Sequence, residues 1–234
     1  LIEFDVDWAH DEIIDYSYQI LKRANIKATW FNTHKSKIME EISHDEMHDV
    51  GIHPNFVFNL KADADRHRPI KTIFSELMSL HPDAKVMKSH SLVDSTVIQE
   101  SARNFGITHD NNIFVPDRNV ILKPWVHYNE MIRLPLRWED DTTCLNPKAY
   151  NITELLKVTG LKIFGFHPIH VFLNTENLDR YEASRHQHHN PTELWKYRNS
   201  GYGTEDRLQK VIKQINMNQS VDAEPEANDK SLAT

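Results

Sequence analysis

Apolar and polar residues change period repeatedly along this chain, and the pattern predicts strands that alternate with helices. A short apolar run at 1–7 is typical of a buried strand, and over 9–24 apolar residues recur three or four positions apart, as in an amphipathic helix. We expect further strands at 26–32, 50–54, 85–88, 132–136 and 161–166 and a short one at Ile107. We expect further helices at 36–48, 66–80, 93–105, 204–217 and from Asn190 onward, where Pro191 and Glu193 complete a helix-start pattern.

This alternation predicts an α/β fold in which helices cover a parallel sheet. No internal repeat or linker divides the sequence, so we expect a single catalytic domain over 1–218. Periodicity is lost from about Asn218, and we expect residues 219–234 to be a disordered tail.

Composition and charge narrow the classes of function. The 234 residues carry a net charge of −7 and form no basic patch, so we expect no nucleic-acid partner. No apolar run approaches membrane-spanning length and no signal peptide is recognisable, so we expect a cytoplasmic protein without a transmembrane segment. Cys144 is the single cysteine, which excludes an internal disulfide. The sequence does not indicate an oligomeric state.

Polar residues with catalytic chemistry follow several of the expected strands. The carboxyl ends of parallel strands form one edge of a sheet, where active sites gather. Such residues occur here as Asp5 and Asp7, Asn32 and His34, His53 and Asn55, Lys88 and His90, and His167 and His170. We therefore expect a functional site at that edge.

The first of these pairs, Asp5 and Asp7, is spaced to point to one side of a strand. Two neighbouring carboxylates repel each other unless a proton or a cation lies between them, so a divalent metal is one interpretation. The alternative is that Asp7 caps the helix that follows.

His53 and the segment 88–90 offer further candidates, each with a simpler alternative. His53 can bind a metal, or its ring can be satisfied by a backbone carbonyl. His90 can also be a ligand, and Lys88 can pair with a carboxylate such as Asp5 or be a solvated lysine. The cluster at 186–189, which contains three histidines, is interpreted first as surface and second as an adventitious metal site.

Two later segments complete the set of candidates. Trp138 precedes the acidic residues 139–141 and can form an apolar wall against a sugar ring, although such an acidic run is most often a solvated turn. His167 follows the last expected strand, in a position for a general acid, with His170 as a partner.

Taken in order, these segments resemble the polysaccharide deacetylase (NodB-homology) family, and within it a WbmS-like subgroup associated with surface-polysaccharide gene clusters. The resemblance spans residues 1 to about 205. It is carried by Phe-Asp-Val-Asp-Trp-Ala at 4–9, Gly-Ile-His-Pro-Asn-Phe at 51–56, Lys-Ser-His-Ser-Leu at 88–92, Trp-Glu-Asp-Asp at 138–141 and Phe-His-Pro-Ile-His at 166–170. It implies a distorted (β/α) barrel of about seven strands.

The resemblance also implies roles for individual residues. In the catalytic step, Asp5 would be the base, His167 the acid and Lys88 the partner of the base. Asp7 and His53 would bind the metal. The substrate would be bound by Trp138, Asp140 and Asn55. The family's second metal-binding histidine falls on Val57, which cannot bind a metal, and its usual arginine is Lys88. We infer His90 as the third ligand, because it ends a strand expected to neighbour the one ending in His53. Water or Asn55 is the alternative.

The implied reaction is metal-assisted removal of an N-acetyl group from an amino sugar of a surface polysaccharide, such as lipopolysaccharide, or its precursor. The mixed nitrogen and oxygen ligands suit zinc and are also compatible with cobalt, nickel or manganese. Two alternatives stay open. One is a non-catalytic carbohydrate-binding protein on the same fold, supported by Val57, and the other is a metal-dependent C–N hydrolase acting on a small molecule.

Overall fold

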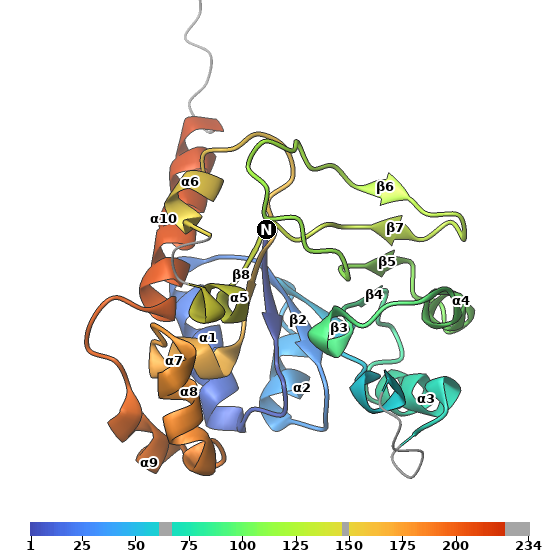
Figure 1. Cartoon of the computed structure of the whole chain (residues 1–234), viewed down its shortest axis with the longest axis horizontal. Coiled ribbons are helices and arrows are strands. Elements are labelled where there is room, and N and C mark those ends of the chain that lie inside the picture. Colours follow the sequence, from blue (N-terminus) through green and yellow to red (C-terminus); the bar gives the residue numbers. More distant parts are fainter. Residues whose placement is uncertain (61–66, 147–149, 223–234) are drawn as a thin grey trace, which may run out of the picture.

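The computed structural model describes residues 1–60, 67–146 and 150–222, which form a half-open barrel of strands surrounded by helices (Figure 1). The expected distorted (β/α) barrel is confirmed, and the described residues form nine strands in the order β6-β7-β5-β4-β3-β2-β1-β9-β8. The strands are β1 (Ile2–Asp5), β2 (Ala28–Asn32), β3 (His48–Ile52), β4 (Val86–Met87), β5 (His109–Asp110), β6 (Trp125–Val126), β7 (Ile132–Arg133), β8 (Trp138–Glu139) and β9 (Phe164–Phe166). The structure has more strands than the seven expected, because several strands are only two residues long and are not detectable from the sequence pattern.

All neighbouring strands pair in parallel, except for β6 and β7 at one edge of the sheet, which pair antiparallel. Strand β1 lies between β2 and β9, with Phe4 opposite Trp30 on one side and Phe166 on the other. The carboxyl ends of β1, β3, β4, β8 and β9 therefore share one edge of the sheet, which positions the candidate site.

Helices cover the outside of the half-barrel (Figure 1). The longer ones are α1 (Asp11–Ala24), α3 (Ile70–Leu80), α4 (Thr96–Asn104) and α10 (Thr204–Asp222), and the shorter ones are α2 (Lys37–Ser43), α5 (Asp140–Leu145), α6 (Ile152–Leu155), α7 (Pro168–Leu173), α8 (Leu178–Ser184) and α9 (Pro191–Leu194). The Asn190 side chain caps α9 as expected, by accepting the Glu193 N–H.

Several expected boundaries differ from those of the structure. Helix α2 ends at Ser43, because the turn that follows leads into β3 at His48. Helix α3 begins only at Ile70, and Arg66, its expected first residue, lies outside the described residues. Helix α10 continues to Asp222, into the expected tail, of which residues 223–234 lie outside the described part.

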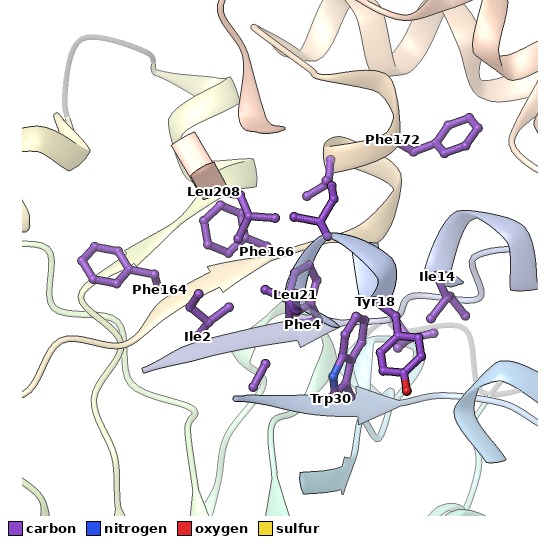
Figure 2. Packing of buried hydrophobic residues seen from close by; sticks show 14 of the residues in the cluster. Ile2, Phe4, Ile14, Tyr18, Leu21, Trp30, Phe164, Phe166, Phe172 and Leu208 are labelled. Atoms are coloured by element: carbon purple, nitrogen blue, oxygen red, sulfur yellow. The ribbon is translucent and has the colours of Figure 1, made fainter. Parts of the chain in front are cut away.

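Strand β1 divides its side chains between two environments. Ile2 and Phe4 belong to a core that β1, β2 and β9 form with α1, α7 and α10 (Figure 2). There the Phe4 ring stacks on Trp30 with centroids 4.3 Å apart. Glu3 and Asp5 alternate with these apolar residues and point to the opposite face, into the barrel. A second core lies between β3, β4 and helices α3 and α4.

Among the described residues, the helices include none with the length and apolarity needed to cross a membrane.

Candidate active site

Four strand ends and the segment that contains His90 bring the candidate residues into one small cavity. Asp5 and Glu139 end β1 and β8, His53 follows β3, and His167 follows β9. His90 is fixed beside the β3 end, because its backbone N–H donates to the Pro54 carbonyl at 3.0 Å. The cavity has a volume of about 60 Å³, and its lining includes Asp5, Asp7, His53, His90, Glu139, Asp141 and His167.

Asp7, His53 and His90 form the group most suited to a metal. Asp7 Oδ1 lies 3.2 Å from His53 Nε2 and 2.8 Å from His90 Nδ1, and the three possible ligand atoms lie within 4.8 Å of one another. Burial raises the pKa of Asp7, but the contact with His53 and the hydrogen bond with His90 outweigh it and hold that pKa well below its usual value.

The local backbone of Asp7 differs from the expectation. Strand β1 ends at Asp5, and Asp7 lies in a turn with a φ of 46°, so the two carboxylates converge through this turn and not through the alternation of a strand. Asp7 does not cap α1, because the Nδ1 atom of His10 accepts the Glu12 N–H at that helix start. The capping alternative for Asp7 is therefore wrong.

The donor set fits a divalent cation. His53 is buried, and among the described residues its ring nitrogens make no well-formed hydrogen bond, although Nε2 lies 3.2 Å from Asp7 Oδ1. A buried imidazole without a well-formed hydrogen bond is costly, and a cation held with the Asp7 carboxylate would compensate it. The backbone carbonyl that the simpler interpretation required is not found among these residues.

Lys88 is the centre of a buried ionic cluster, so the interpretation as a solvated lysine is wrong. Its Nζ atom lies 2.7 Å from Asp5 Oδ2, 2.9 Å from Glu3 Oε1 and 2.6 Å from Glu139 Oε1. Burial lowers the pKa of Lys88, but the three carboxylates raise it well above its usual value. A Cβ atom at Gly165 would lie 3.2 Å from Nζ, so the cluster is tightly enclosed there.

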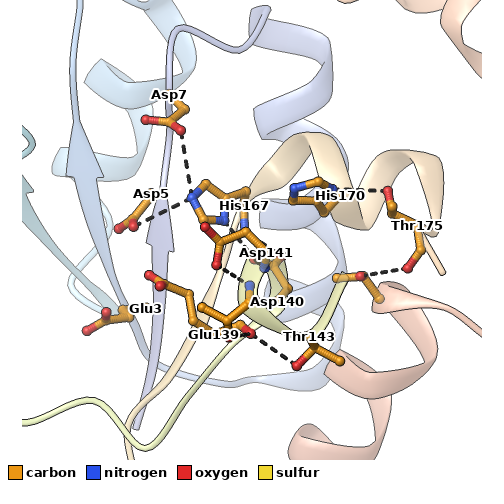
Figure 3. A network of polar contacts seen from close by, with 12 residues as sticks. Glu3, Asp5, Asp7, Glu139, Asp140, Asp141, Thr143, His167, His170 and Thr175 are labelled. Carbon is orange, nitrogen blue, oxygen red and sulfur yellow. Dashed lines mark hydrogen bonds and ion pairs between the residues drawn. The ribbon is translucent and has the colours of Figure 1, made fainter. Parts of the chain in front are cut away.

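His167 is held by Asp140, which begins α5 (Figure 3). The Nδ1 atom of His167 lies 2.6 Å from Asp140 Oδ1, and the backbone N–H of His167 donates to Oδ2 at 2.8 Å. Burial lowers the pKa of His167, but Asp140 raises it well above its usual value. The Nε2 atom lies 3.7 Å from both Asp5 and Asp7, so it faces the cavity.

His170 lies behind His167 and does not line the catalytic cavity. Its Nδ1 atom is 3.1 Å from Thr175 Oγ1, and burial lowers its pKa to about 4. His170 therefore packs as a neutral imidazole beside the ring of His167.

Three residues expected to bind substrate do something else. Trp138 is completely buried, with its ring 5.1 Å from that of Phe166 and its Nε1–H donating to the Tyr150 carbonyl. Because neighbouring side chains alternate along β8, Glu139 takes the cavity side and Trp138 the core side. Asp140 is also completely buried and binds His167. Asn55 Oδ1 accepts the Val57 N–H at 2.9 Å, in the turn after β3.

The histidine cluster at 186–189 is a surface feature, as first expected. His186 and His189 are exposed, and His188 Nε2 lies 3.2 Å from both Ser184 Oγ and the Tyr181 carbonyl. Within the described ranges, the groups of three potential ligands do not include these histidines.

Two residues of the site had no assigned role from the sequence. Glu3 was missed, although its position two residues before Asp5 placed it on the same face of β1. Asp141 was grouped in an acidic turn, yet it lines the cavity, where burial, followed by the charge of Glu139, raises its pKa to about 7. Its environment depends on distant strands and was not visible in the local sequence.

Comparisons with known proteins agree with this geometry. The sequence profile of the WbmS-like polysaccharide deacetylases matches residues 2–185. A Bordetella bronchiseptica protein, described as a polysaccharide deacetylase involved in O-antigen biosynthesis, is 35% identical and has a TM-score of 0.85, covering 91% of this chain and 89% of its own. A search of curated proteins gives no significant match.

Two more distant structures are similar at lower levels. A Mycobacterium smegmatis protein described as a polysaccharide deacetylase is 13% identical with a TM-score of 0.46, covering 99% of this chain and 93% of its own. A family 4 carbohydrate esterase from Streptomyces lividans is 8% identical with a TM-score of 0.40, covering 71% of this chain and 77% of its own. The long profile match and the Bordetella structure show that this chain belongs to the WbmS-like polysaccharide deacetylase family.

Proposed function

We propose that this protein is a metal-dependent hydrolase that removes an N-acetyl group from an amino sugar. The observation that carries the proposal is the convergence of Asp7, His53 and His90 in one cavity with Asp5 and His167. A ligand group, a base and an acid are the three components that hydrolysis of an amide at a metal requires.

Asp7, His53 and His90 would hold the metal, with zinc the best fit to these donors and cobalt, nickel or manganese also compatible. When bound, the metal supplies Lewis acidity. Among the described residues Asp5 Oδ1 has no hydrogen-bond partner, while Lys88 holds the other oxygen at 2.7 Å. Asp5 is thereby oriented with one free oxygen to accept a proton from the attacking water.

His167 is suited to the opposite proton transfer. Because Asp140 raises the pKa of His167 well above its usual value, the imidazolium is the resting form. Its Nε2–H faces Asp5 and Asp7 across the cavity and can be donated to the departing amine nitrogen. The two sides of the cavity thus provide a proton acceptor and a proton donor.

The proposed substrate is an amino sugar of a surface polysaccharide or its precursor. Its support is the Bordetella relative, which is described as acting in O-antigen biosynthesis. Family membership is consistent with a carbohydrate substrate.

The test combines metal analysis with release of acetate from N-acetylated sugars. We expect purified protein to contain a stoichiometric divalent metal and to release acetate. Asp5→Asn should abolish turnover and keep the metal, because the amide preserves shape but cannot accept the proton. His53→Ala should lose both. Equal metal loss in the two variants would make Asp5 a ligand and contradict this division of roles.

A non-catalytic carbohydrate-binding protein is the second candidate, favoured by one observation. Val57 stands where the family has a second metal-binding histidine, and its side chain packs against the second core. Metal-loaded protein that binds N-acetylated sugars but releases no acetate would favour this candidate.

A further inference from the structure

The catalytic cavity is too small to contain a sugar. Its volume of about 60 Å³ is far below the roughly 300–1,000 Å³ of sites that hold a small molecule. An acetamido group can enter such a space, whereas a pyranose ring must lie outside it. If the proposed function is correct, the structure should therefore have a second surface for the ring, directly beside the catalytic residues.

A larger surface also borders Asp7. A second cavity, of about 350 Å³, is lined by Asp7, Trp8, Ile169, Tyr181, Arg185 and His189, among others. This volume is at the lower end of the range for small-molecule sites. Asp7 lines both cavities, so a ligand in the larger one lies next to the proposed metal-binding group.

Trp8 is an unusual residue at this position. Its φ of 58° is in the left-handed region, which is unfavourable for a bulky side chain. Its backbone N–H is held by Thr33 Oγ1 at 3.0 Å, and 41% of the residue is exposed. The Trp8 ring makes an edge-to-face contact with the ring of His90, with the two centroids 5.3 Å apart. A strained backbone therefore presents an indole to solvent at the border of the site.

The remaining wall complements this indole. Tyr181 is partly buried, and its ring lies 4.5 Å from that of His188 and 5.0 Å from that of His170. Arg185 and His189 are exposed on the rim and can donate hydrogen bonds. Aromatic faces with polar donors around them match a pyranose, which has apolar C–H faces and a belt of hydroxyl groups.

We propose that Trp8 and Tyr181 form the subsite for the pyranose ring whose acetamido group enters the catalytic cavity. This inference rests on the proposed function and adds to it the residues that select a sugar over a small amide. Trp8 takes the role that the sequence suggested for Trp138.

The test measures binding in the zinc-loaded Asp5→Asn variant, which separates binding from turnover. The probes are methyl N-acetylglucosaminide and N-methylacetamide, which has the amide but no ring, titrated by NMR. Burial of one indole face should contribute about tenfold in affinity. We expect Trp8→Ala to weaken glucosaminide binding by about that factor and to leave N-methylacetamide unchanged, with Trp8→Phe restoring most of the loss.

The matched control is Trp125→Ala, because Trp125 is 40% exposed, close to the 41% of Trp8, and lies on the edge strand β6. Trp8→Gly provides a second variant, since glycine suits the positive φ. Unchanged glucosaminide binding in Trp8→Ala and Trp8→Gly would overturn the subsite. A zinc titration that shows equal loss of metal affinity would also overturn it, because Trp8 would then act through His90.

The two proposals fail separately. Trp8-dependent glucosaminide binding without acetate release from the wild-type protein would support the subsite and contradict the deacetylase. Acetate release from methyl N-acetylglucosaminide that is the same in wild-type and Trp8→Ala protein would support the deacetylase and overturn the subsite.

Discussion

The Nδ1 atom of His167 lies 2.6 Å from Oδ1 of the buried Asp140, and the other oxygen of that carboxylate accepts the backbone N–H of His167. One side chain thereby fixes both the ring and the backbone of the proposed general acid. This arrangement makes Asp140 a positioning residue.

We expect Asp140→Asn to lower kcat by roughly a hundredfold, because the imidazolium loses its counter-charge and its orientation. Metal content should be unchanged, since Asp140 does not contact Asp7, His53 or His90. In a His167→Asn background the same change should cost almost nothing further, because the two residues act as a unit. Additive losses in kcat would show that Asp140 acts elsewhere.

His90→Ala should weaken metal binding as strongly as His53→Ala, measured by calorimetric titration. A directly bound ligand contributes more than the roughly 10–100-fold effect of an outer contact. Asn55→Ala is the matched comparison, because Asn55 is the alternative ligand but its Oδ1 already accepts the Val57 N–H. Metal affinity that falls in Asn55→Ala and not in His90→Ala would reverse this assignment.

Lys88→Met should destabilise the protein by about 3–5 kcal/mol, because three carboxylates would remain buried without a cation. Urea unfolding followed by circular dichroism measures this loss.

Glu3→Gln is the informative control. The pKa of Glu3 is raised, first by burial, and removing its charge leaves two carboxylates for one ammonium. We expect Glu3→Gln to be at least as stable as the wild-type protein. A loss of stability as large as that of Lys88→Met would argue against an excess of negative charge in the cluster.

Stability should fall as the pH drops from about 6.5 to about 4, in part because of His170. Its pKa is near 4 in the folded protein, lowered from 6.5 by burial. The unfolded chain therefore takes up a proton in this window while the folded protein does not, which removes up to about 3 kcal/mol. His170→Gln should flatten the dependence of unfolding free energy on pH, and exposed His186→Gln should not. An unchanged slope in His170→Gln would show that other groups govern acid unfolding.

Much of the fold was predictable because its signals are local. The apolar run of β1 and the helical periodicity of α1 identify both elements, and parallel strands necessarily bring Asp5, His53, Lys88 and His167 to one edge. The short strands β5 to β8 were harder to delimit, since two residues provide no period to detect.

The errors in the site come from contacts between distant segments. Trp138 lies beside an acidic run, and nothing local shows that Phe166, on β9, covers its ring. The role of Asp140 depends in the same way on the backbone of His167. Glu3 is the exception, because the alternation of β1 already placed it beside Asp5.

The close approach of Gly165 to the Lys88 ammonium has an evolutionary consequence. A Cβ at position 165 would also lie 3.3 Å from Leu136 and 3.4 Å from Glu139, so a larger residue on β9 would require these side chains and the ammonium to shift by a few tenths of an ångström. The family's usual arginine is larger and planar, and a single exchange at position 88 would have to displace these neighbours. The residues at positions 88 and 165 are therefore coupled, and an arginine at position 88 would need compensating changes among the side chains that enclose it.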